Sequence, residues 1–140
     1  MAATIVHGKE IAENIKRKVR EEIGNGVRLK LGILCANAAS PTNYLKRQQQ
    51  TAASVGVDVE VAYCTSQSKQ EDAETIVRRW NRDHTVNGIF ILQPLVPGID
   101  LDLLRAVTHP LKDIEAAHPF NAMLRYYSKT PFGTCTAIAI

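Results

Sequence analysis

The feature that most constrains the fold is an alternation of helix-like and strand-like stretches from residue 9 to residue 92. Residues 9–23 carry an apolar residue at every fourth position, and residues 69–84 repeat apolar residues at i, i+3, i+4 and i+7; both spacings are helical. Short apolar or alternating stretches at 28–36, 57–63 and 86–92 are typical of strands. Strands separated by helices pair in parallel through right-handed crossovers. The sequence therefore predicts an α/β fold, a short three-layer α/β/α domain with a parallel sheet.

Local signals indicate where the helices begin and end. Gly24 and Gly26 follow the first helix as stop signals. A helix before the second strand is predicted with Ser40 as its N-cap, Pro41 at its first position and Gly56 as its C-terminal stop. The apolar stripes of the first and third helices consist of Ile11, Ile15, Val19 and Ile23, and of Ala73, Ile76, Val77 and Trp80.

The strands differ in their pattern, and this predicts their places in the sheet. Residues 86–92 are apolar on both sides, which predicts a central strand, whereas 57–63 alternate and so have one polar face. Leu101, Leu104 and Val107 then predict a short helix, and a loop leads into another. Ligand sites in parallel sheets form beyond the carboxyl ends of the strands. These ends are residues 35–44, 63–68 and 92–98.

Composition and charge are typical of a soluble globular domain. The chain has 140 residues, enough for one domain, with 45% hydrophobic and 22% charged residues. Its net charge of +3 is too small to require a polyanionic partner. No apolar run has transmembrane length, and the N-terminus lacks the pattern of a signal peptide. We therefore expect no membrane contact.

The cysteines and histidines give no sign of a disulfide or a metal site. Cys35, Cys64 and Cys135 are far apart and odd in number, so we expect small buried residues in a reducing compartment, the cytoplasm or the mitochondrial matrix. The four histidines show no paired ligand spacing, so no metal is expected.

Six segments carry a resemblance that extends over essentially the whole chain. In order, they are HGKEIAENIKRKV, LGIL, the Tyr44 helix ending in AASVGV, VNGIFILQPLVPGID, HPLKDIEAAHPFNAMLR and PFGTCTA. In this order and spacing they resemble the methylenetetrahydrofolate dehydrogenase/cyclohydrolase family. The resemblance implies that residues 1–140 form the family's N-terminal folate-binding and catalytic domain.

The resemblance also sets expectations about ligands. The family's second domain is a Rossmann domain for NAD(P), which this sequence lacks, since it contains no Gly-x-Gly-x-x-Gly after a strand. We therefore expect no cofactor bound by this chain alone and NAD(P) only if a second domain exists. A tetrahydrofolate derivative is the ligand that the resemblance allows.

The family's active helix carries Tyr-x-x-x-Lys, which places both side chains on one face beside the folate. Tyr44 matches the tyrosine, which would contact the pterin, but Gln48 stands at the lysine position. The lysine would move a proton in the cyclohydrolase step, which glutamine cannot do. Lys46 and Arg47 point in other directions and do not replace it. We expect Gln48 to be catalytically non-functional.

The family's third strand ends in Gln-Leu-Pro-Leu-Pro, and its glutamine helps to hold the lysine and the folate. Here Leu92 is at the equivalent position, and a glutamine follows at Gln93, before Pro94. One residue of shift turns a strand side chain to the opposite face, so Gln93 would reach the cleft only through a bulge. The alternative is a strand-end glutamine that meets solvent.

The family's Lys-Asp-x-Asp-Gly loop uses its second aspartate to bind the pterin amino and ring N–H groups. Glu115 is at this position, with the same charge on a longer arm. Ala116 replaces the glycine, which would disfavour the local backbone if φ is positive there. Cys135 and Thr136 match two positions of the family's Pro-Cys-Thr-Pro motif.

Three hypotheses follow. In the first, the chain is a derived, catalytically impaired homologue that acts as a structural or assembly subunit, and a protein partner or a second copy covers its exposed apolar surface. In the second, it is an active one-carbon folate enzyme or a folate-binding domain seen as a fragment. In the third, basic helix faces contact RNA, although such runs are usually solvated. These faces contain Lys16, Arg17, Lys18 and Arg20, and Arg78, Arg79 and Arg82.

Overall fold

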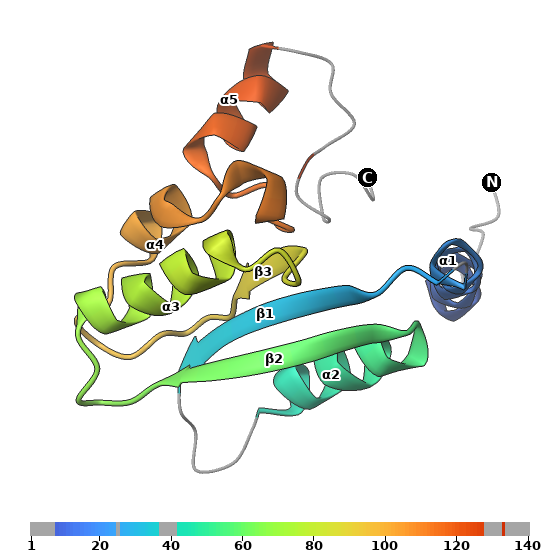
Figure 1. Cartoon of the computed structure of the whole chain (residues 1–140), viewed down its shortest axis with the longest axis horizontal. Coiled ribbons are helices and arrows are strands. Elements are labelled where there is room, and N and C mark those ends of the chain that lie inside the picture. The colour runs from blue at the N-terminus through green and yellow to red at the C-terminus, as the bar shows by residue number, and fades with distance from the viewer. Residues whose placement is uncertain (1–7, 25, 37–41, 128–132, 134–140) are drawn as a thin grey trace, which may run out of the picture.

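The computed structural model describes residues 8–24, 26–36, 42–127 and 133, and within them it contains a three-stranded parallel sheet with helices on both faces (Figure 1). The strands are β1 (Leu29–Ala36), β2 (Val57–Cys64) and β3 (Gly88–Ile91). The helices are α1 (Gly8–Ile23), α2 (Asn43–Ser54), α3 (Gln70–Arg82), α4 (Leu101–Val107), the 3-10 helix η1 (Pro110–Lys112) and α5 (Pro119–Tyr127).

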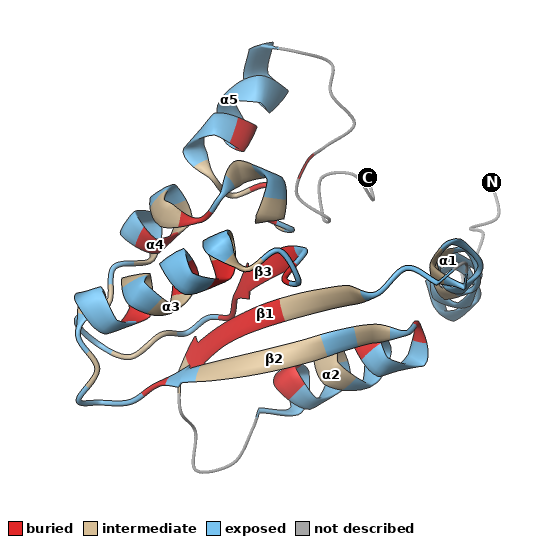
Figure 2. Ribbon diagram, viewed as in Figure 1, coloured by how far each residue is buried: buried red, intermediate tan, exposed pale blue. Residues whose placement is uncertain are grey.

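The helices and the sheet form the three layers that the sequence predicts. Helix α2 covers one face of the sheet, and α3 with α4 covers the other (Figures 1 and 2). All pairings in the sheet are parallel, with Leu29 opposite Val57 between β1 and β2, and Leu31 opposite Gly88 between β1 and β3. The predicted α/β class is therefore confirmed.

The order of the strands differs from the prediction. The sheet order is β2-β1-β3, so β1 is central and the prediction of a central third strand is wrong. All four residues of β3 are nevertheless buried. The reason is that the loop after η1 covers the outer edge of β3: Ile89 forms a parallel bridge with Asp113, and Ile114 N donates to Ile89 O at 3.5 Å. An edge strand covered in this way has the same apolar pattern as a central one.

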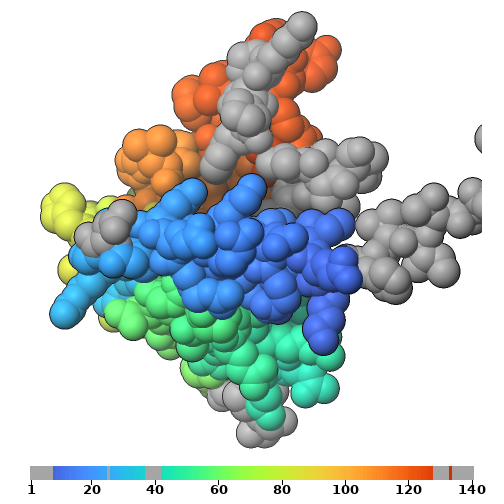
Figure 3. Space-filling view, turned by 90° about the vertical axis from the view of Figure 1, so that its right-hand side faces the viewer, coloured from blue at the N-terminus to red at the C-terminus, as the bar shows by residue number. Residues whose placement is uncertain are grey.

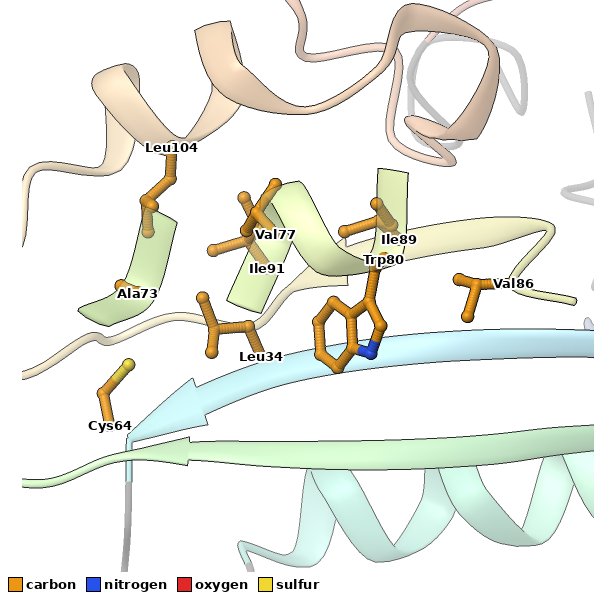
Figure 4. Packing of buried hydrophobic residues seen from close by; sticks show 9 residues of the cluster. All are labelled: Leu34, Cys64, Ala73, Val77, Trp80, Val86, Ile89, Ile91 and Leu104. Atoms are coloured by element: carbon orange, nitrogen blue, oxygen red, sulfur yellow. The ribbon is translucent and has the colours of Figure 1, made fainter. Parts of the chain in front are cut away.

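One part of the core lies between the sheet and α3. Trp80 is fully buried, and its ring lies so close to Gly32 that a Cβ there would be 2.7 Å from Trp80 Cδ2. Trp80 Nε1 donates to Glu60 Oε1 at 2.8 Å. This bond holds the pKa of Glu60 below its ordinary value, and the charges of Lys30 and Arg79 add to the effect. Burial acts in the opposite direction but does not cancel it. Figure 4 shows the buried cluster, which consists of Leu34, Cys64, Ala73, Val77, Trp80, Val86, Ile89, Ile91 and Leu104.

The other part of the core lies between the sheet and α2. Its members are Ile33, Cys35, Leu45, Phe90 and Leu92. Both cysteines that the structure describes, Cys35 and Cys64, are buried and free, and burial raises the pKa of each thiol. For these two, the prediction of small buried residues is confirmed; Cys135 lies outside the described residues.

Helix α2 begins later than the sequence signals predict. Its N-cap is Thr42, whose Oγ1 accepts a hydrogen bond from Leu45 N at 3.2 Å, so the prediction of Ser40 as N-cap and Pro41 as first helical residue is wrong. Ser40 and Pro41 themselves lie outside the described residues. Serine and threonine are both preferred N-cap residues, so the sequence alone does not show whether Ser40 or Thr42 begins the helix. Gly56 follows the helix with φ +81°, which confirms it as the stop.

Helix α1 forms where its periodicity predicts, but only the second half of its apolar stripe, Val19 and Ile23, is partly buried. Ile11 and Ile15 are 52% and 57% exposed, and no residue of α1 is buried. The helix lies across one end of the molecule, where it faces the viewer in Figure 3. One bond that joins it to the body runs from Arg20 Nη1 to Ser54 O, at 3.2 Å.

Candidate functional site

A cavity of about 410 Å³ opens at the carboxyl end of β3, between the start of α2 and the loop that follows η1. This is an edge at which sites of parallel sheets form, and the volume suits a small organic ligand. The residues that line it are Thr42, Tyr44, Phe90, Ile91, Leu92, Gln93 and Glu115. Four predicted site residues from three separate segments therefore share one cavity.

Tyr44 forms one wall of the cavity. It is the second residue of α2, so the Thr42 cap that begins this helix also fixes where the ring lies. The ring meets Phe90 edge-on, with centroids 6.4 Å apart and an interplanar angle of 61°. Because Tyr44 remains 52% exposed, much of its surface is available to a planar ligand.

Gln48 lies one helical turn beyond Tyr44 and is half-buried, but it is not among the residues that line the cavity. Lys46 and Arg47 are exposed and do not line it either. Among the described lining residues there is neither a lysine nor an arginine. The described lining of the cavity therefore contains no cationic side chain.

Leu92 and Gln93 both line the cavity, although they differ in burial. Leu92 is 8% exposed, belongs to the cluster beneath α2 and donates from its N to Leu34 O at 2.8 Å. Gln93 is exposed and is joined to Pro94 by a cis peptide bond. It reaches the cavity because it lies beyond Ile91, the last residue of β3, where strand alternation no longer fixes the side-chain direction. Because Gln93 is also exposed, the alternative of a strand-end glutamine that meets solvent is compatible with this position, and a ligand-binding role for Gln93 stays a prediction. Pro94 is not among the lining residues.

Glu115 supplies the carboxylate of the cavity. It is half-buried, and this burial raises its pKa above the ordinary value; Arg105 opposes the shift and Asp113 adds to it. A carboxyl group with a raised pKa in a cavity can accept hydrogen bonds when ionised and can hold a proton closer to neutral pH than an exposed glutamate does.

The loop that carries Glu115 is held by residues whose role the sequence analysis missed. Asp113 is buried, and its carboxylate accepts hydrogen bonds from Glu115 N at 3.2 Å and His118 N at 2.7 Å. Lys112 Nζ donates to three main-chain carbonyls at the C-terminal end of α3. These are the oxygens of Trp80 at 2.8 Å, Asn81 at 3.0 Å and Asp83 at 2.8 Å. An Asp-x-Glu spacing permits an Asx turn, which is the one local signal for this arrangement.

Ala116 adopts a backbone conformation that is unfavourable for any residue with a Cβ. Its φ is +51°, in the left-handed region, and the residue is buried. For a residue with a Cβ this conformation costs roughly 1–2 kcal/mol. The chain thus keeps the loop shape that glycine would favour, without the glycine.

Four of the seven basic residues on these faces of α1 and α3 form ion pairs with acidic neighbours. The ion pairs on these helices join Lys16 to Glu13 at 2.9 Å, Arg17 to Glu21 at 3.1 Å, Arg78 to Glu74 at 3.1 Å and Arg79 to Glu60 at 2.6 Å. Such pairing is typical of a solvated helix face. RNA contact by these faces stays a prediction.

Among the residues that the structure describes, no helix combines the length and the apolar character needed to cross a membrane. In the same ranges, no group of three or more His, Cys, Asp and Glu side chains is arranged to hold a metal ion. Cys135 and Thr136, the remaining positions of interest from the sequence, lie outside these ranges.

Comparison with known families gives a match over most of the chain. The model described as "Tetrahydrofolate dehydrogenase/cyclohydrolase, catalytic domain" matches residues 6–115. The bifunctional protein FolD of Staphylococcus epidermidis is 27% identical over 145 residues, which cover 100% of this chain and 51% of that protein. The FolD protein of Alkaliphilus metalliredigens is 32% identical over 142 residues, covering 97% and 50%. The chain therefore spans about half the length of the curated relatives it matches.

Solved structures show the same fold. The bifunctional FolD methylenetetrahydrofolate dehydrogenase/cyclohydrolase from Campylobacter jejuni aligns with a TM-score of 0.86 at 23% identity, over 96% of this chain and 50% of that one. The Trypanosoma brucei dehydrogenase-cyclohydrolase, solved with NADP cofactor and an inhibitor, aligns with a TM-score of 0.77 at 23% identity, over 89% and 44%.

Proposed function

Because the chain belongs to the tetrahydrofolate dehydrogenase/cyclohydrolase family through its catalytic domain, we propose that it is a catalytically impaired member. It retains a pocket for a tetrahydrofolate derivative and serves as a structural or assembly subunit of a larger complex. The observation that carries the impairment is Gln48, together with the lack of a lysine or arginine among the described residues that line the cavity. An amide neither carries a positive charge nor exchanges a proton near neutral pH.

The cavity supports binding of a reduced folate by its chemistry. A pterin ring is planar and presents an amino group beside a ring N–H. The Tyr44 ring offers it a flat apolar surface, and the Glu115 carboxylate can accept two hydrogen bonds at once. Gln93 adds an amide with both a donor and an acceptor. NAD(P) would require a second domain and is not part of this proposal.

The assembly role is supported by apolar side chains that the described residues leave exposed. On α1 these are Ile11 and Ile15; on α5, Phe120, Met123 and Tyr127 are 47%, 48% and 79% exposed. Exposed apolar groups gathered on two helices are typical of surfaces that another chain covers. A purified chain that stays monomeric at high concentration and binds no hydrophobic dye would contradict this role.

The second candidate is an active one-carbon folate enzyme, and the specific observation in its favour is Glu115. This half-buried carboxyl group in the cavity wall has a raised pKa, so it can exchange a proton nearer to neutral pH than an ordinary glutamate. If it replaced the family lysine as proton carrier, Glu115→Gln would abolish a turnover that the unmodified chain already shows.

The test combines binding and turnover. Titration with tetrahydrofolate should show saturable binding that Tyr44→Ala weakens. Gln48→Lys should then introduce methenyltetrahydrofolate hydrolysis, because a lysine one turn from Tyr44 would bring an ammonium group towards the ligand. The matched control is Gln50→Lys, since Gln50 is exposed and points elsewhere on the same helix. Failure to bind any tetrahydrofolate derivative would refute the pocket assignment, and equal rates for the two variants would refute the role given to position 48.

A further inference from the structure

Asn121 is a buried polar residue that lies outside the cavity, on the inner side of α5. Its side chain is 5% exposed, and its amide group donates two hydrogen bonds. One goes from Nδ2 to Pro110 O, at the start of η1, and the other from Nδ2 to Asp113 Oδ2; both are 2.9 Å long. A single amide therefore ties α5 to both ends of the segment from residue 110 to residue 113.

Asp113 connects Asn121 to Glu115, which lines the cavity. Its Oδ2 accepts from Asn121 and from His118 N at 2.7 Å, while its Oδ1 accepts from Glu115 N at 3.2 Å. A buried carboxylate needs several donors to offset the loss of water. With each oxygen engaged, the plane of the carboxylate is fixed, and so is the main chain at Glu115.

We propose that Asn121 is a positioning residue of the folate pocket, which through Asp113 holds the Glu115 carboxylate in the cavity wall that it shares with Tyr44. The inference rests on the proposed function for the identity of the ligand, but not for the geometry. The amide suits this role because its two N–H bonds diverge from one rigid plane, and the two acceptors lie on different parts of the loop. A hydroxyl group has only one donor and could satisfy only one of them.

The left-handed backbone at Ala116 is a second reason why the loop needs this support. Immediately after Glu115 the chain takes a conformation that an alanine does not favour. Without the bonds from Asn121, the segment is free to relax towards a more favourable backbone, and the carboxylate moves with it. Asp113, which accepts the bond from Asn121, and Ala116, which has the unfavourable backbone, lie three residues apart in the same loop.

The experiment is a double-mutant cycle on the full chain, with Asn121→Ala and Glu115→Gln. Asn121→Ala should weaken tetrahydrofolate binding about tenfold, and the effect should disappear in the Glu115→Gln background, because the asparagine acts through that carboxylate. Asn121→Ser is the second variant, which leaves a smaller cavity if the alanine variant does not fold. Asn87→Ala is the matched control, since Asn87 accepts from Lys30 N and contributes no side chain to the folate cavity.

A carboxyl-carbon NMR titration of Glu115 supplies a readout that needs no ligand. In the unmodified chain Glu115 should titrate above the range of an exposed glutamate, and in the Asn121 variants it should move towards that range, while the Asn87 control leaves it in place. If the chain binds no folate but the titration shifts, the proposed function fails and the positioning role stands. Additive effects in the cycle, or an unchanged Glu115 titration in a folded Asn121 variant, would overturn the inference.

Discussion

Replacement of Lys112 by methionine tests how the loop that carries Glu115 is attached to the rest of the domain. The ammonium group donates to the carbonyl oxygens of Trp80, Asn81 and Asp83, at 2.8, 3.0 and 2.8 Å. These carbonyls lie at the C-terminal end of α3, where a helix has unsatisfied acceptors and favours a positive charge. Methionine keeps most of the apolar stem but removes the charge and all three donors.

The expected loss of stability follows from these three contacts. A hydrogen bond to a charged group contributes about 1.5–3 kcal/mol, and a cation at a helix C-terminus about 0.3–1 kcal/mol. The three bonds share one ammonium group and are not additive, so we expect Lys112→Met to lower the free energy of unfolding by about 2–4 kcal/mol. Urea unfolding followed by far-ultraviolet circular dichroism measures this directly. With a slope of about 2 kcal/mol per molar urea, the middle of the usual range for small proteins, the midpoint should fall by about 1–2 M.

Lys46→Met is the matched control, because Lys46 is exposed on α2 and does not line the cavity. It should change the free energy of unfolding by less than about 0.5 kcal/mol, as surface substitutions usually do. If Lys112→Met has as small an effect as Lys46→Met, the attachment of the loop to α3 by this side chain is refuted.

Three further changes test the core, the loop and the dependence on pH. Gly32→Ala should destabilise the domain by about 1–3 kcal/mol, because the new Cβ overlaps the buried ring of Trp80. The midpoint of urea unfolding measures this loss, and an unchanged midpoint would contradict the close packing of Gly32 against Trp80. Ala116→Gly should raise the free energy of unfolding by up to about 1 kcal/mol, because it removes an alanine with a left-handed backbone. The control Ala117→Gly should lower it. If urea unfolding shows Ala116→Gly to be the less stable of the two variants, the strain at Ala116 is refuted. The lowered pKa of Glu60 stabilises the native state above the unfolded-state pKa of about 4.3, and this contribution disappears as the pH falls through the folded-state value. Glu60→Gln should therefore reduce stability at neutral pH and much less in acid, and an equal loss at both pH values would exclude this linkage.

The elements that the sequence predicts well are those whose signal is local. Trp80 and its apolar neighbours on α3 follow the helical period, and the strands are short apolar runs, so both appear where expected. The order of the strands was wrong because the burial of β3 depends on Asp113 and Ile114, which come from a loop more than twenty residues later in the chain. No pattern within β3 itself distinguishes a covered edge from a central position.

The sequence predicts those site residues that belong to a recognisable motif, and it does not predict the residues that hold them in place. The resemblance assigned Tyr44 and Glu115 to one ligand site, and the structure brings both to the same cavity. Gln93 was assigned by strand alternation, which no longer applies after the end of β3. Lys112 and Asn121 were missed because their partners are main-chain carbonyls and a buried carboxylate, and the sequence does not reveal which of these groups lack a partner.

Because Gln48 stands at the position of the family lysine, we propose that the pocket lacks a proton carrier. The most direct measurement is the rate of methenyltetrahydrofolate hydrolysis by the unmodified chain at neutral pH, compared with the same buffer without protein. Under this proposal we expect saturable binding of tetrahydrofolate and a hydrolysis rate equal to that of the buffer. A saturable rate well above the buffer rate, which Glu115→Gln or Tyr44→Ala abolishes, would contradict it and identify the chain as an active enzyme.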